Sequence, residues 1–314
     1  MKKNWIIILT VICIFITCCS KSITQEKMLE VNFIYSKHSD LVFHVLAYLE
    51  VNNASNLYDI EYINKMELEK QNFEYNIIPN IILLQEYYNV NFDRLEVINF
   101  LSFYCNNFIE FKDMLLNFNK FNQNDIQYFI IPFIEIMEKE SLFYFGFWDK
   151  LHNNNINIRE LLEEYIKKNL NNFNHLFEYF NKSSNVFLSY SITRNGRGFY
   201  IDDYFSAAVP FIKDQDKFQN VFFMLLHEYT HQFTDNLLSS NINFDDGSHN
   251  LSEKIVILAD YYLIKGIDEN LIKNYIGFFF GDAIESENDF INYFMVEETL
   301  KVKIIELIKS IIKK

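Results

Sequence analysis

Two histidines one helical turn apart are the residues of this sequence best suited to chemistry. They are His227 and His231, and Glu228 follows the first of them, so the segment reads HExxH. Side chains four residues apart on a helix share a face, with Cβ atoms about 5–6 Å apart. Both imidazoles can then reach one Zn²⁺, while Glu228 lies beside the metal, placed to take a proton from a bound water. The spacing therefore predicts a zinc site with Glu228 as general base.

The HExxH motif needs a helix to hold its register, and one is predicted over residues 216–238. Two strand patterns precede it, at Val186–Ile192 and Phe199–Ile201, and the glycine-containing segment 194–198 between them favours a β-hairpin. A second helix is expected over about 251–265. The motif helix should therefore follow a small antiparallel sheet and precede a further helix.

A carboxylate on that second helix makes the segment resemble the gluzincins, the zincin metallopeptidases whose third zinc ligand is a glutamate on a downstream helix. Glu253 lies 22 residues after His231, similar to the spacing in that group. The resemblance covers residues 185–265 and implies a zincin-like catalytic region in which His227, His231 and Glu253 bind Zn²⁺. Four other residues stay open as substitute ligands: Asp245, Asp246, His249 and Asp260.

Glu253 also has a structural interpretation. Asn250 to Glu253 reads as a capping box, in which Glu253 would reach back to the start of its helix. Asp260 is seven residues after Glu253 and falls on nearly the same helix face, where it could orient an imidazole from behind. Many gluzincins carry an aspartate four residues after the ligand glutamate, and this chain has Ile257 there.

The resemblance also implies a group that stabilises the oxyanion and a strand that pairs with the substrate. Gluzincins often use a tyrosine or histidine from outside the motif, and three tyrosines are candidates here: Tyr200, Tyr261 and Tyr262. Either predicted strand could pair with an extended peptide. Arg194 and Arg197 could bind a substrate carboxylate or lie in a solvated turn.

An export signal begins the chain. Trp5–Thr17 is apolar but too short to span a bilayer comfortably, and Ile-Thr-Cys-Cys-Ser at 16–20 resembles a bacterial lipobox. We expect residues 1–18 to be a lipoprotein signal peptide, Cys19 to be lipidated and residues 19–28 to form a tether. The protein would then be exported and membrane-anchored, facing the periplasm or the cell surface. An ordinary secretory signal and an uncleaved anchor are the alternatives.

Composition favours an α+β, predominantly α-helical fold. The 314 residues include 7 Gly and 3 Pro, too few for a many-stranded sandwich or barrel. The formal net charge of −14 argues against nucleic acid as a partner, because phosphates repel such a chain. We expect a mainly helical region at 29–180 and the zincin-like catalytic region at 181–314, sharing a core. The oligomeric state stays open.

Three functions are compatible with these features. The first is a membrane-tethered zinc metallopeptidase that hydrolyses peptide bonds of a peptide or protein substrate through a zinc-activated water. The second is a non-enzymatic surface lipoprotein, a binding or adhesion module with a degenerate zincin fold. The intact Glu228 argues against such decay, because a metal site without catalysis does not need it. The third is zinc-dependent hydrolysis of a non-peptide bond.

Overall fold

The computed structural model describes residues 31–49, 58–173, 176, 184–201, 204–239, 248–281, 283 and 286–313. The expected signal peptide, Cys19, the tether, Asp245 and Asp246 lie outside these residues. The first elements are β1 (Val31–Ile34), α2 (Lys37–Tyr48), α3 (Ile60–Glu69), α4 (Ile78–Val90), α5 (Phe92–Leu95), α6 (Ile98–Leu101), α7 (Phe108–Asn117), α8 (Gln123–Asp125), α9 (Ile131–Asn154) and α10 (Ile156–Asn172). There follow β2 (Ser184–Ser189), β3 (Arg197–Ile201), β4 (Tyr204–Pro210), α12 (Phe218–Ser239), α13 (Ser248–Ile267), α14 (Ile272–Phe280), α15 (Glu287–Tyr293) and α16 (Glu298–Ile312). None of the helices described is both long and apolar enough to cross a bilayer.

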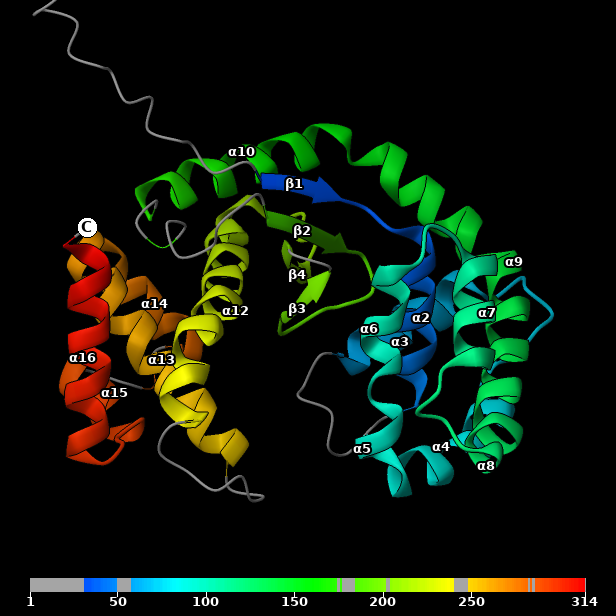
Figure 1. The fold of residues 1–314 in the computed structure, drawn as a ribbon. Coiled ribbons are helices and arrows are strands. Elements are labelled where there is room, and N and C mark those ends of the chain that lie inside the picture. The colour runs from blue at the N-terminus through cyan, green and yellow to red at the C-terminus, as the bar shows by residue number, and fades with distance from the viewer. Residues whose placement is uncertain are drawn as a thin grey trace, which may run out of the picture.

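The prediction of a predominantly helical α+β fold is confirmed, but the expected antiparallel sheet is wrong. The four strands are ordered β1-β2-β4-β3 and form a mixed sheet (Figure 1). β1 and β2 are parallel, as are β2 and β4, and only β3 runs antiparallel to its neighbour β4. The predicted strands β2 and β3 therefore do not form a hairpin with each other.

The missed strand β4 explains this error. Phe205, Ala207 and Val209 pack against one apolar cluster, and Ala208 packs against the other. A strand that is apolar on both faces belongs inside a sheet, where both faces are covered. β4 accordingly lies between β2 and β3. Residues 190–196 connect β2 to β3 across the position that β4, the next strand in the chain, occupies. The glycine-containing β3 is left at the edge.

The sheet separates two apolar clusters. One contains buried residues of α2 to α9, and the other contains residues of α10 and of α12 to α16. Successive β2 residues alternate between them: Phe187 belongs to the first cluster, and Val186 and Leu188 to the second. Helix α10 precedes residue 181, yet Leu162 and Ile166 pack with the C-terminal helices. Packing therefore divides the chain at the sheet and not at residue 180.

Helices α12 and α13 lie side by side, and α12 packs on the face of the sheet that belongs to the second apolar cluster (Figure 1). α12 contacts both β3 and β4 through its apolar face, which includes Val221, Phe222 and Leu225. Tyr229, in the middle of α12, packs its ring 5.1 Å from that of Phe205 on β4. The sheet thus fixes the position of the helix that carries the HExxH motif.

Candidate metal centre

The two histidines of α12 point at the same place. The Nε2 atoms of His227 and His231 are 3.2 Å apart, and their ring planes are perpendicular. Their side chains are 15% and 24% exposed, so solvent reaches the space in front of them. The predicted helix is present, and the spacing of four residues brings the two imidazoles together on one face of it, as expected.

Helix α13 brings Glu253 to the two histidines. Its Oε2 lies 3.2 Å from Nε2 of His227, and its Oε1 lies 3.5 Å from Nε2 of His231. In the described part of the chain, these three residues form the one group of histidine, cysteine or acidic side chains whose ligand atoms converge tightly enough for a metal ion.

The ligand atoms are close enough together to share one zinc ion. Tetrahedral Zn²⁺ with ligand bonds of about 2.0–2.1 Å keeps its ligand atoms about 3.3 Å apart. The two histidine Nε2 atoms are 3.2 Å apart, and the two Glu253 oxygens approach them separately, Oε2 at 3.2 Å from His227 and Oε1 at 3.5 Å from His231; one ligand atom from each of the three residues lies within 4.8 Å of the others. Two imidazoles and one carboxylate are also a donor set that zinc accepts in catalytic sites, with the fourth position left for solvent or substrate. The residues present therefore fit Zn²⁺.

The capping-box interpretation of Glu253 is wrong. α13 begins at Ser248, so Asn250 lies inside the helix and cannot cap it. Burial by itself would raise the pKa of Glu253, but hydrogen bonds and charges from His227 and His231 outweigh it and hold that pKa well below its usual range. The carboxylate is therefore anionic and faces the two imidazoles.

Asp260 lies behind His227. Its Oδ2 is 3.4 Å from Nδ1 of His227 and accepts a hydrogen bond from the Tyr275 hydroxyl at 3.1 Å. The Asp260 side chain is fully buried, and among the described residues neither its Oδ1 nor Nδ1 of His227 has a hydrogen-bond partner. A buried carboxylate is costly without a positive or strongly donating neighbour. An imidazole that binds a metal through Nε2 offers such a neighbour through Nδ1–H.

The electrostatic environment of His227 favours positive charge. Burial would lower the pKa of its imidazole, but Asp260 and Glu253 raise the pKa to about 10. The charge of Glu228 acts in the same direction. A site in which three carboxylates favour a proton on one imidazole is equally suited to a metal cation.

Glu228 is buried against the edge strand. Only 8% of the residue is exposed, and its carboxylate lies beside Gly196 and Gly198. A Cβ atom on either glycine would come within 3.0 Å of this side chain. Burial raises the pKa of Glu228, although His227, His231 and Arg197 oppose the shift. The glycines thus make the space in which this carboxylate is held.

The three candidate tyrosines are placed differently. The Tyr261 hydroxyl donates to Glu287 at 2.6 Å and accepts from Lys265 at 3.1 Å, so it is engaged in an ion-pair cluster. Tyr262 is half-buried with its ring 5.2 Å from that of Tyr261. Tyr200 lies on β3, and its side chain is outside the described part of the structure. The same holds for the side chain of His249, one of the substitute ligands.

Among the strands that the structure describes, β3 is unpaired on its outer side, beside the candidate site. It is the last strand in the sheet order and contacts α12. β2, the other predicted substrate strand, is paired on both sides and offers no edge. Sequence patterns missed the strand order, and with it the positions of Gly196 and Gly198 against Glu228. The glycine pair itself was the only available signal.

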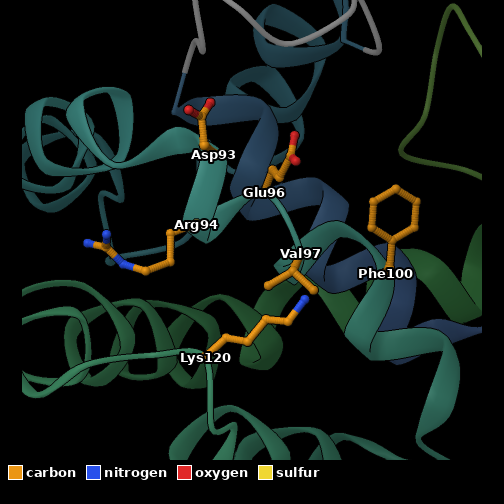
Figure 2. A pocket seen from close by; sticks show the side chains of 6 residues that line it. All are labelled: Asp93, Arg94, Glu96, Val97, Phe100 and Lys120. Carbon is orange, nitrogen blue, oxygen red and sulfur yellow. The ribbon is translucent and has the colours of Figure 1, made fainter. Parts of the chain in front are cut away.

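A separate pocket of about 550 Å³ lies on the helical region, lined by Asp93, Arg94, Glu96, Val97, Phe100 and Lys120 (Figure 2). Arg94 in its wall pairs with Asp125 at 2.6 Å. The lining includes neither histidine nor cysteine, so its chemistry differs from that of the candidate metal centre. Phe100 connects the pocket to β3, because its ring lies 6.1 Å from that of Phe199.

No family model matches the chain, and neither a curated protein nor a solved structure matches it.

Proposed function

We propose that the protein is a membrane-tethered zinc metallopeptidase. The observation that carries the proposal is the convergence of His227, His231 and Glu253 at separations of 3.2, 3.2 and 3.5 Å, with Glu228 buried on the same helix. Zinc bound there would acidify a water molecule and polarise the carbonyl to be cleaved. The membrane tether rests on the lipobox-like sequence before Cys19.

The residues of this chain have distinct roles in the proposal. His227, His231 and Glu253 hold the metal. Glu228 follows a ligand on α12 and accepts the proton of the attacking water, then gives it to the leaving amine nitrogen. Asp260, whose Oδ2 lies 3.4 Å from Nδ1 of His227, would accept a hydrogen bond from Nδ1–H once the metal holds Nε2, and would keep the imidazole in the orientation that directs Nε2 toward Glu253.

A peptide is the substrate that the edge strand favours. An extended peptide adds to an exposed strand through main-chain hydrogen bonds, whatever its side chains are. β3 offers such an edge, and Gly196 and Gly198 place it against Glu228. A peptide bond lying on β3 would therefore pass close to the general base.

The test uses the purified full chain loaded with zinc and a mixture of unstructured peptides. We expect about one zinc per chain, hydrolysis that a chelator abolishes, and recovery when zinc is returned. Glu228→Gln should keep the zinc and lose about 10²- to 10⁴-fold in kcat, the usual contribution of a general base. The control is Glu138→Gln, an exposed glutamate on α9 that should change neither quantity.

Two results would overturn the proposal. Absence of stoichiometric zinc in the folded protein would remove the metal centre. Zinc without turnover of any peptide would remove the enzymatic function and favour a binding lipoprotein instead.

A further inference from the structure

Arg197 has a buried guanidinium nitrogen that no described residue satisfies, while its charge acts on the carboxylate of Glu228. It stands on the edge strand β3, is half-buried, and has no ion pair or side-chain hydrogen bond within the described residues. Its Nε is buried without a partner, and its guanidinium carbon lies 5.8 Å from the centre of the Phe100 ring. Such a guanidinium loses hydration without gaining hydrogen bonds, which is unfavourable unless a ligand supplies them.

The contrast with Arg194, three residues earlier, is informative. Arg194 is exposed, yet it pairs with Asp59 at 3.4 Å. The chain carries 42 acidic residues against 28 basic ones, so carboxylates are abundant. Within the described structure, the more exposed arginine forms an ion pair with one of them, and the more buried Arg197 forms none, although its charge acts on Glu228.

A second buried polar group is within reach of the Arg197 charge. The hydroxyl of Tyr58, two residues before α3, is buried and has no hydrogen-bond partner among the described residues. Burial raises the pKa of Tyr58, and the nearby Arg197 charge partly opposes that rise. A guanidinium and a phenol hydroxyl with unused donors together suit a carboxylate, which accepts several hydrogen bonds.

The position of Arg197 along β3 relates it to the reaction. Gly196 and Gly198, its two neighbours, both lie against Glu228. Side chains alternate between the faces of a strand, so Arg197 is level with the general base but directed to the opposite face, where it meets Phe100. On a peptide paired with β3, the residue opposite Arg197 would have its Cβ about 4.5–5.5 Å away.

We propose that Arg197, assisted by Tyr58, binds a carboxylate of the substrate next to the bond that is cleaved. The inference rests on the proposed peptidase function and adds a substrate class to it: peptides that present a carboxylate at this point. The carboxylate can belong to the free C-terminus or to an aspartate or glutamate side chain. Both sources offer the same planar acceptor to the guanidinium.

The experiment measures binding apart from turnover. The zinc-loaded full-length Glu228→Gln variant is titrated with two sets of short acetylated peptides. The first set compares a peptide that ends in a free carboxylate with the same peptide as its C-terminal amide. The second set consists of amidated peptides that carry Glu or Gln at each position in turn. We expect a carboxylate-bearing peptide to bind about 10- to 100-fold more tightly than its neutral match, the range for a hydrogen-bonded charge. The position of the preferred carboxylate distinguishes a C-terminus from a side chain.

Variants then assign the preference. Adding Arg197→Gln should remove the preference for a carboxylate, while the affinity for neutral peptides and the zinc content stay unchanged. Tyr58→Phe should reduce the preference. Arg194→Gln is the matched control in the same connection and should leave it intact. Zinc content and circular dichroism verify that each variant is folded.

Equal binding of charged and neutral peptides would overturn the inference, as would a preference that survives Arg197→Gln. Neither outcome concerns hydrolysis. A wild-type protein that selects carboxylates but cleaves no peptide would instead refute the proposed function.

Discussion

Replacing Gly198 by alanine should slow hydrolysis without weakening zinc binding. A Cβ atom at this position would lie 3.0 Å from Oε2 of Glu228 and 3.0 Å from Cζ of Phe205. Ordinary van der Waals contacts begin at 3.4 Å, so each of the two neighbouring atoms would have to move away from the new methyl group by about 0.4 Å. Phe205 is only 6% exposed and packs against Tyr229, so the Glu228 carboxylate moves most.

The size of the effect follows from this displacement. A misplacement of about 1 Å in a catalytic group can cost 10²-fold in rate. A shift of about 0.4 Å should therefore lower kcat by roughly 6-fold, because a barrier that rises in proportion to the displacement gives 0.4 of two decades. The zinc Kd should stay the same, because a Cβ at position 198 would approach none of the three ligands closely.

The assay compares kcat at saturating peptide and zinc with the zinc Kd from competition with a chromogenic chelator. Gly146→Ala, on α9 with open space around the added Cβ, is the control and should leave both quantities unchanged. It should also raise the free energy of unfolding by about 0.5–1 kcal/mol, because glycine inside a helix is less favourable than alanine. An unchanged kcat in Gly198→Ala would refute the position or the role given to Glu228.

Three further variants and one control test the metal centre and the scaffold. Asp260→Asn should raise the zinc Kd about 10- to 100-fold, and an unchanged Kd in the chelator competition would mean that it does not support a ligand. Glu253→Gln should weaken zinc binding more than that, and wild-type affinity would point to another third ligand. Glu140→Ala should lower the free energy of unfolding in urea by about 3–5 kcal/mol, because it leaves Lys70, whose side chain is 4% exposed, without its buried carboxylate. Glu138→Ala, an exposed ion-pair residue on the same helix, should cost no more than about 1 kcal/mol, and equal losses would contradict the distinction.

The part of the site that lies on helices could be predicted from the sequence. Helical periodicity relates residues four or seven apart without knowledge of the fold. It brings His227 and His231 together on α12, and it places Glu253 and Asp260 on one face of α13. The structure has Glu253 on the Nε2 side of His227, 3.2 Å away, and Asp260 on the Nδ1 side, 3.4 Å away.

The part that depends on strand order could not be predicted. A strand pattern says which residues are extended but not which strand lies next to which. The glycines at 196 and 198 between two strand patterns indicated a hairpin, and strands adjacent in the chain usually do pair. The structure inserts β4 between β2 and β3, and this insertion is what puts Arg197 at the edge of the sheet.

The prediction that Asn250 caps the helix carrying Glu253 was wrong for a local reason. Asn250 and Glu253 have the residue types and spacing of a capping box, and such a box is a short-range signal. The helix nevertheless begins earlier, at Ser248. A sequence window cannot decide between two nearby polar starts when both are compatible with the apolar positions that follow.

The helical region contributes to the site through the end of β2. Fully buried Asp40 on α2 accepts hydrogen bonds from the Ser189 hydroxyl and from the Tyr190 amide at 3.2 Å. Ser191 is bonded in turn to the hydroxyls of Tyr62 at 2.9 Å and Tyr144 at 2.5 Å. These contacts from α2, α3 and α9 fix the chain just before it turns into the glycine-containing connection.

The position of that connection determines where β3 lies. Gly196 and Gly198 meet Glu228 only if the chain leaves β2 in the right direction, and residues 189–191 are where that direction is set. Buried hydrogen bonds to three helices from the first part of the chain are made at this point, beside bonds within the segment itself. The helical region therefore helps to hold the edge strand β3 against Glu228, through the sheet that both parts of the chain share.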